Sequence, residues 1–275
     1  MRRQLAAVAA LVLLAAGCAT DPTVSDAPPA VPPGASPAAS PAASLSASAD
    51  ALDVAATACE VPPRFDRVVV SRLDLTDKLV ALTFDAGANG DGVKPILDTL
   101  EAREVPATFF LTGRFVVTYP GKSQRIARQH LVGNHTFAHP DLTTLPDFRV
   151  VNQVVRAERV IRDSTGEDPR RFFRFPFGAR DAHTIGLLND LCYVPFRWTV
   201  DTLGWKGTSG GMTVTEVVDR VLAAAEPGAI VLMHVGSNPD DGSTLDADAL
   251  PIVIRKLRAR GYSFVRLSKV LAPAP

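Results

Sequence analysis

Cysteine is scarce in this chain, and no charge of one sign is in excess. The 275 residues include three cysteines, and 29 Lys and Arg balance 29 Asp and Glu to a formal net charge of zero. Three cysteines are too few for a disulfide scaffold or a multi-cysteine zinc or iron–sulfur module. A neutral chain also lacks the overall basic field that holds a nucleic-acid backbone. We therefore expect no nucleic-acid partner, while five histidines leave room for a small metal site.

A hydrophobic run long enough to cross a membrane is also missing at the start of the chain. The apolar run from Leu5 to Ala16 follows Met1-Arg2-Arg3 and is shorter than the roughly 20 residues of a membrane span. A basic start before a short apolar run is typical of an export signal. Small residues then precede Cys18, which resembles the lipobox of bacterial lipoproteins. We predict a lipoprotein signal over residues 1–18; an ordinary cleaved signal is the alternative.

The resemblance to a lipobox implies that Cys18 is lipidated and holds the chain on a bacterial membrane, facing the cell wall or periplasm. Residues 19–58 are Ala, Pro and Ser with hardly any large apolar side chain. Such a segment cannot bury enough surface to offset its ordering entropy, which predicts a disordered tether. Residues 59–275 are predicted to form one folded domain, acting as a monomer. Export favours a disulfide between Cys59 and Cys192, although two separate buried thiols remain the alternative.

Short apolar runs alternate with amphipathic stretches through this domain, which predicts an α/β fold with parallel strands. The predicted strands are Leu79–Phe84, Ala107–Leu111, Phe172–Phe175, Tyr193–Val200, Ile230–Met233 and Ser263–Leu267. The predicted helices are Val93–Arg103, Gln124–His130, Phe148–Ile161, Thr213–Ala225 and Ala249–Arg260. Polar residues fall where several of these strands end, namely Asp85, Arg174, Asp201 and His234. Because the carboxyl ends of parallel strands share one face, we expect these side chains to meet there.

Two histidines, His135 and His139, are separated by four positions. In a helical turn this spacing places both imidazoles on one side, within reach of one metal ion. The pair alone is a weak signal, because it also occurs by chance at a surface or in a core. It lacks the glutamate of the His-Glu-x-x-His metalloprotease motif, which disfavours peptide hydrolysis by that mechanism.

Five segments in order resemble the polysaccharide deacetylase family of carbohydrate esterases, which includes chitin and peptidoglycan deacetylases. They are Thr83-Phe84-Asp85-Ala86-Gly87, His135-Thr136-Phe137-Ala138-His139, Arg174-Phe175-Pro176-Phe177-Gly178, Asp201-Thr202-Leu203-Gly204-Trp205 and Leu232-Met233-His234. The resemblance covers nearly the whole domain, from about Lys78 to Leu267. The resemblance implies a distorted (β/α) barrel of about seven parallel strands. It also implies a divalent metal, often zinc, and removal of acetyl groups from N-acetylated sugars of a polysaccharide.

The resemblance also implies roles for single residues. His135 and His139 would hold the metal, which polarises the acetamide carbonyl and activates a water molecule. Asp85 would be the general base, with Arg174 holding it ionised, and His234 the general acid. The substrate-binding residues would be Pro176, Phe177, Trp205 and Leu232. From composition alone, Trp205 and Leu232 could equally belong to an ordinary core.

The chain departs from the family pattern at two positions. Ala86 stands where the family has a second aspartate, the third metal ligand. Asp85 itself, or Asn89 or Asp91 on the same loop, could replace it, or the metal could be weakly held. Gly204 stands where the family has an aspartate that tunes the catalytic histidine. We expect Asp201 to take over that task rather than the acidic loop at residues 238–241.

Three functions fit these patterns. The first is a deacetylase acting on peptidoglycan or a related N-acetylglucosamine polymer. The second is a glycan-binding protein that kept the groove but lost turnover through Ala86 and Gly204. The third is a metal-dependent amidase with a non-sugar substrate. Retention of Asp85, Arg174 and His234 favours an enzyme, because binding alone needs no base and acid.

Overall fold

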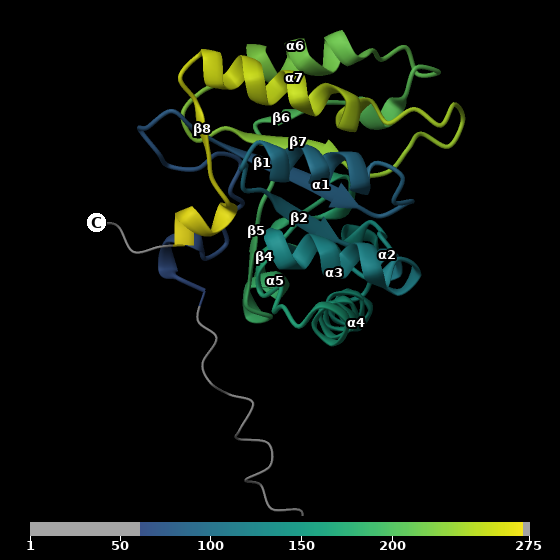
Figure 1. The fold of residues 1–275 in the computed structure, drawn as a ribbon. Coiled ribbons are helices and arrows are strands. Elements are labelled where there is room, and N and C mark those ends of the chain that lie inside the picture. Colours follow the sequence, from purple (N-terminus) through teal and green to yellow (C-terminus); the bar gives the residue numbers. More distant parts are fainter. Residues whose placement is uncertain (1–60, 272–275) are drawn as a thin grey trace, which may run out of the picture. The chain divides into compact units, whose positions relative to one another are not determined.

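A computed structural model describes residues 61–271 of the chain (Figure 1). The predicted signal at residues 1–18, the lipidation site Cys18, the tether at residues 19–58 and Cys59 lie outside these described residues. Within residues 61–271, none of the helices has both the length and the apolar character that crossing a membrane requires.

The centre of the fold is a sheet in which every strand pair is parallel. Its strands are β1 (Leu79–Ala86), β2 (Thr108–Leu111), β3 (Leu131–Asn134), β4 (Arg171–Phe173), β5 (Tyr193–Pro195), β6 (Val200–Asp201), β7 (Ile230–His234) and β8 (Ser263–Phe264). The order is β5-β4-β3-β2-β1-β7-β6, and β8 pairs with the start of β1. Since β5 and β6 are the two ends of this order, the seven strands form a half-barrel. The predicted distorted barrel is confirmed.

Helices surround the sheet, as Figure 1 shows. They are α1 (Val93–Ala102), α2 (Gly113–Thr118), α3 (Pro120–Gln129), α4 (Asp147–Thr165), α5 (Ala182–Asp190), α6 (Val214–Ala223) and α7 (Leu245–Ala259). Helix α7 packs against α1 and α6, while α4 packs against α2 and α3. The connection after each parallel strand has to return to the other end of the sheet, which places these helices on its outside.

Side chains alternate between the two faces of each strand, which decides what reaches the barrel interior. In β1, Leu82, Phe84 and Ala86 belong to the apolar cluster shared with α1, α6 and α7. In β2, Phe109 belongs to that cluster, whereas Phe110 belongs to a second cluster with Ile230 and Phe196. Asp85 therefore projects to the face opposite Ala86. The missing aspartate of the first motif is replaced by a residue of the hydrophobic core.

One sequence prediction of secondary structure is wrong, and one strand (β3) and two helices (α2 and α5) were not predicted. The run Tyr193–Val200 is two strands at opposite ends of the sheet, since β5 pairs with β4 and β6 pairs with β7. Pro195 ends β5 because it has no N–H for a ladder. Strand β3 was not predicted, because Gly133 weakens its β pattern. Gly133 is required there: a Cβ atom at this position would lie 2.7 Å from the Phe110 ring.

Cys192, at the turn between α5 and β5, is disulfide-bonded. It is the sole cysteine within residues 61–271, so its partner lies outside the described residues. Pairing with Cys59 stays a prediction.

Candidate active site

The polar residues that the sequence placed after the strands converge at the carboxyl edge of the half-barrel. Asp85 at the end of β1 lies in register beside His234 at the end of β7. His135 directly follows β3, and Arg174 directly follows β4. Neighbouring parallel strands deliver all four to the same edge, as expected.

Arg174 is fully buried and binds Asp85 directly. Its Nη1 donates to Asp85 Oδ1 at 2.7 Å, while Nε and Nη2 donate to the carbonyl oxygens of Phe196 and Arg197 at 3.3 and 3.1 Å. The guanidinium also lies 4.2 Å from the centre of the Phe110 ring. Burial, the largest single influence, would raise the pKa of Asp85, but the charge and hydrogen bond of Arg174 act together with His135 and His234 to lower that pKa. Asp85 is therefore an ionised, oriented carboxylate.

His135 lies between the carboxylate and the backbone of β4. Its Nδ1 is 2.7 Å from the Arg174 carbonyl oxygen, and its Nε2 is 3.4 Å from Asp85 Oδ2. A carbonyl can only accept, so Nδ1 carries the proton and Nε2 has a free lone pair. Burial lowers the pKa of His135, and it lowers that of His139 to about 4. Both imidazoles are therefore neutral near pH 7, the state that binds metals.

The predicted helical turn joining the two histidines is wrong. Residues 135–139 form an irregular loop, with left-handed backbone at Thr136 (φ 67°) and His139 (φ 60°). Hydrogen bonds hold this loop, from the Thr136 N–H to the Asn134 side chain and from the His139 N–H to Thr136 Oγ1. The loop still brings the two imidazoles together, with ring centres 4.7 Å apart. The proximity comes from turns rather than from helical spacing.

The two imidazoles predicted to bind a metal lie close together, but no third side chain joins them to complete a metal site among the described residues. Within residues 61–271, no group of three or more imidazole, thiolate or carboxylate side chains is placed to hold a metal ion. Ala86 belongs to the hydrophobic core. The side chains of Asn89 and Asp91, the other candidate ligands on this loop, both form hydrogen bonds with Ser237. Catalytic zinc sites ordinarily have three protein ligands. The described residues therefore do not fit a tightly held catalytic metal.

His234 is next to a buried carboxylate that the sequence analysis did not single out. Its Nδ1 lies 3.7 Å from Oδ2 of Asp246, in the first turn of α7. Burial lowers the pKa of His234, but the carboxylates of Asp246, Asp85 and Asp201 outweigh burial and raise it. The predicted helix began only at Ala249, whereas α7 begins at Leu245, so nothing in the sequence singled out Asp246.

Asp201, predicted to tune His234, acts on it through charge at longer range. Its Oδ1 accepts a hydrogen bond from the Leu203 N–H at 2.8 Å. The acidic loop at residues 238–241 also has a local task, because the side chain of Asp241 accepts from Thr208 Oγ1 and from the Ser243 N–H. This loop thus fastens the segment after Trp205.

The predicted substrate-binding residues divide into two exposed aromatics and two buried residues. Phe177 is 72% exposed, and its ring meets the His139 ring edge-on at 4.6 Å. Trp205 is 46% exposed, with its ring centre 6.4 Å from that of His234. Leu232 and Pro176 are buried. Each exposed ring thus lies beside one end of the polar cluster, where it could stack against a sugar ring.

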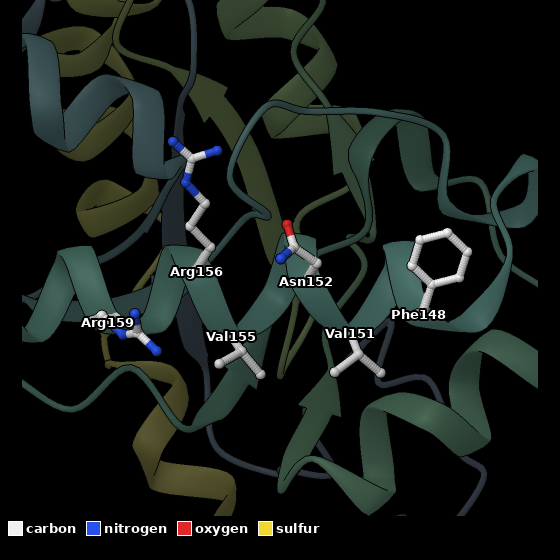
Figure 2. A pocket seen from close by; sticks show the side chains of 6 residues that line it. All are labelled: Phe148, Val151, Asn152, Val155, Arg156 and Arg159. Atoms are coloured by element: carbon white, nitrogen blue, oxygen red, sulfur yellow. The ribbon is translucent and has the colours of Figure 1, made fainter. Parts of the chain in front are cut away.

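A separate hollow of about 380 Å³ lies on the outer face of α4, as Figure 2 shows. Its lining residues are Phe148, Val151, Asn152, Val155, Arg156 and Arg159. None of the predicted site residues contributes to it. This hollow is therefore separate from the polar cluster at the strand ends.

Comparisons with known proteins agree with the motif order. The family model described as polysaccharide deacetylase matches residues 72–196. The chain is 35% identical over 189 residues to a peptidoglycan-N-acetylglucosamine deacetylase of Bacillus cereus, covering 68% of this chain and 66% of that protein. It is 35% identical over 198 residues to a chitooligosaccharide deacetylase of Rhizobium leguminosarum bv. trifolii, covering 68% and 89%.

A solved structure adds a different kind of relative. The crystal structure of a family 4 carbohydrate esterase pseudoenzyme from Bacillus anthracis matches with a TM-score of 0.68 and 29% identity, over 75% of this chain and 69% of that chain. This chain is thus similar both to proteins named as deacetylases and to a pseudoenzyme.

Proposed function

Because the chain belongs to the polysaccharide deacetylase family, we propose that it hydrolyses N-acetyl groups of an extracytoplasmic polysaccharide. Peptidoglycan or a related N-acetylglucosamine polymer is the proposed substrate, and lipidated Cys18 the proposed anchor to a bacterial membrane. The observation that carries the proposal is the pairing of Asp85 with His234 across β1 and β7. Their surroundings push the two pKa values apart, which suits one group to act as base and the other as acid.

In the proposed reaction, water attacks the acetamide carbonyl carbon. Ionised Asp85 takes the proton of the attacking water, and Arg174 keeps that carboxylate charged and aimed. When the carbon–nitrogen bond breaks, protonated His234 gives its proton to the departing sugar nitrogen. The products are acetate and a glucosamine residue. The exposed rings of Phe177 and Trp205 would hold neighbouring sugar surfaces.

We also propose that His135 and His139 are the ligands of a divalent ion, with zinc the expected metal. When bound, such an ion would supply Lewis-acid chemistry at the acetamide. Because a third protein ligand is not evident, we expect weak Zn²⁺ binding that a chelator removes readily. Isothermal titration calorimetry of chelator-treated full-length protein with Zn²⁺ measures this affinity.

The control for this metal prediction is His183→Ala, since His183 is exposed and pairs with Asp147 away from the site. His135→Ala and His139→Ala should each abolish the Zn²⁺ titration, whereas His183→Ala should leave it unchanged. Zn²⁺ binding that survives both site substitutions would contradict the assignment of these ligands.

Acetate release tests the proposed function directly. Full-length protein is incubated with peptidoglycan, chitooligosaccharides and an N-acetylated amino acid amide, with and without added Zn²⁺, and acetate is measured enzymatically. We expect release from the two glycans alone. Release from the amino acid amide alone would favour the non-sugar amidase.

A glycan-binding protein without turnover is the second candidate, favoured by Ala86 and by the pseudoenzyme relative. In this case the protein would bind the glycans in a pull-down but release no acetate. Asp85→Asn and His234→Ala would then bind as well as the unmodified protein.

A further inference from the structure

Asp246 is a buried carboxylate, 3% exposed, that connects two parts of the site. Its Oδ2 accepts the His234 backbone N–H at 2.8 Å, and the same oxygen is 3.7 Å from His234 Nδ1. Its Oδ1 accepts from Thr202 Oγ1 at 2.7 Å, on the segment that leads to Trp205. The carboxylate of Asp246 thus contacts both His234, the proposed general acid, and the segment that carries the exposed Trp205 ring.

The carboxylate occupies space that a side chain at position 204 would need. A Cβ atom built on Gly204 would lie 2.4 Å from Asp246 Oδ1 and 2.6 Å from Asp246 Cγ. Nonbonded atoms in proteins do not approach each other this closely, so either the new side chain or the Asp246 carboxylate would have to move. Gly204 is absent from the residues with left-handed backbone, so the requirement for glycine is one of space and not of backbone conformation.

We propose that Asp246 is the positioning residue of His234, and that Gly204 is what admits its carboxylate to the site. This inference rests on the proposed function. It gives Asp246 the task that was predicted for Asp201, which is to tune His234. Asp246 fixes the backbone of His234, faces Nδ1 with a negative charge, and ties Thr202 to the same point. A residue at position 204 with a side chain is incompatible with this arrangement. Restoring the aspartate that the family has at 204 should therefore damage the site.

Other charged groups also act on His234. Asp85 from β1 and Asp201 from β6 favour its protonated form, as Asp246 does. On the opposite side of the site are the imidazoles of His135 and His139, which are neutral near pH 7. Loss of the charge of Asp246 should therefore lower the pKa of His234 without abolishing its titration.

The first experiment compares Asp246→Asn with Asp248→Asn. Asparagine keeps the shape and can bond both to the His234 N–H and to the Thr202 hydroxyl, so mainly the charge is lost. Asp248 is in the same turn of α7 but exposed, so its substitution controls for the helix dipole. NMR titration of the His234 ring should give a lower pKa in Asp246→Asn and an unchanged one in Asp248→Asn.

Activity provides the second readout of the same pair. In Asp246→Asn, kcat for acetate release should fall roughly tenfold to a hundredfold and the alkaline limb of its pH profile should move to lower pH, with KM little changed. A merely structural role would lower kcat without moving that limb. An equal His234 pKa in Asp246→Asn and in the unmodified protein would overturn the proposal.

The second experiment relocates the carboxylate. Gly204→Asp should lower kcat at least tenfold, because the new side chain collides with Asp246 and repels it. Adding Asp246→Ala removes the collision and should recover part of that loss. Gly204→Asp with unmodified activity and His234 pKa, or a double variant no better than Gly204→Asp, would contradict the proposal.

These readouts separate the positioning role from the proposed function. If no glycan yields acetate, the proposed function fails, and the NMR titration still decides whether Asp246 controls His234. If Asp246→Asn does not fold, the titration of Gly204→Ala decides it, since a single added methyl group also displaces the carboxylate.

Discussion

Asp85→Asn and His234→Ala should each lower kcat for acetate release by a factor of about a hundred to ten thousand, with little change in glycan affinity. Asparagine cannot accept the proton of the attacking water, and alanine cannot protonate the departing amine. Both groups act mainly in the transition state, so the ground-state complex should form as before. Steady-state kinetics and a glycan pull-down measure the two effects.

The pH profile identifies which group each limb belongs to. Asp85 must be ionised, and Arg174 lowers its pKa, so the acidic limb should lie below the usual range of a carboxyl group. His234 must be protonated, and its carboxylate neighbours raise its pKa, so the alkaline limb should lie above the usual range of histidine. The profile should therefore be a broad bell between them.

Two control variants accompany these substitutions. Asp91→Asn changes a carboxylate on the loop after β1 that bonds to Ser237, and His183→Ala changes a histidine outside the site. Both should retain the bell-shaped profile. Full activity of Asp85→Asn, or retention of the alkaline limb in His234→Ala, would show that the roles are assigned to the wrong residues.

Arg174→Met should lower the free energy of unfolding by about 3–5 kcal/mol at pH 7 and also abolish most activity. Methionine fills much of the arginine volume, so the main loss is the charge that compensates Asp85. The buried carboxylate would then be left beside the neutral His135, without its cation. Urea unfolding of the full-length variant measures the loss of stability.

The pH dependence of this effect follows from the sign of the Asp85 shift. In the folded protein the pKa of Asp85 is lowered from 3.8, so its pairing with Arg174 stabilises the fold above pH about 4 and is lost as pH falls through the folded pKa. The difference between Arg174→Met and the unmodified protein should therefore shrink in acid.

A double variant and a control complete the test of Arg174. Adding Asp85→Asn to Arg174→Met should restore part of the stability, because no buried charge is then left unpaired. Arg197→Met is the control, since the Arg197 side chain is exposed and lies over the Trp198 ring. A fully additive double variant would contradict direct pairing of Asp85 with Arg174.

The sequence by itself determined the fold class and most of the residues at the site. Alternating strand and helix patterns indicate a parallel sheet, and residues that directly follow its strands must reach one edge. Asp85, His135, Arg174 and His234 were identified in this way or through the motifs that contain them. Prediction succeeded here because the positions depend on periodicity along short segments.

Only the tertiary structure decided which of these residues are in contact with one another. The sequence pattern predicts one strand over Tyr193–Val200, but this segment contributes to two strands, β5 and β6, at opposite ends of the sheet. The side-chain alternation of β1 buries Ala86 in the core and turns Asp85 inward. Asp246 is 42 positions from Gly204, and its carboxylate fills the space beside Gly204 only because α7 packs against the short turn Gly204–Lys206. Such contacts join residues far apart in sequence, and no local pattern encodes their distance.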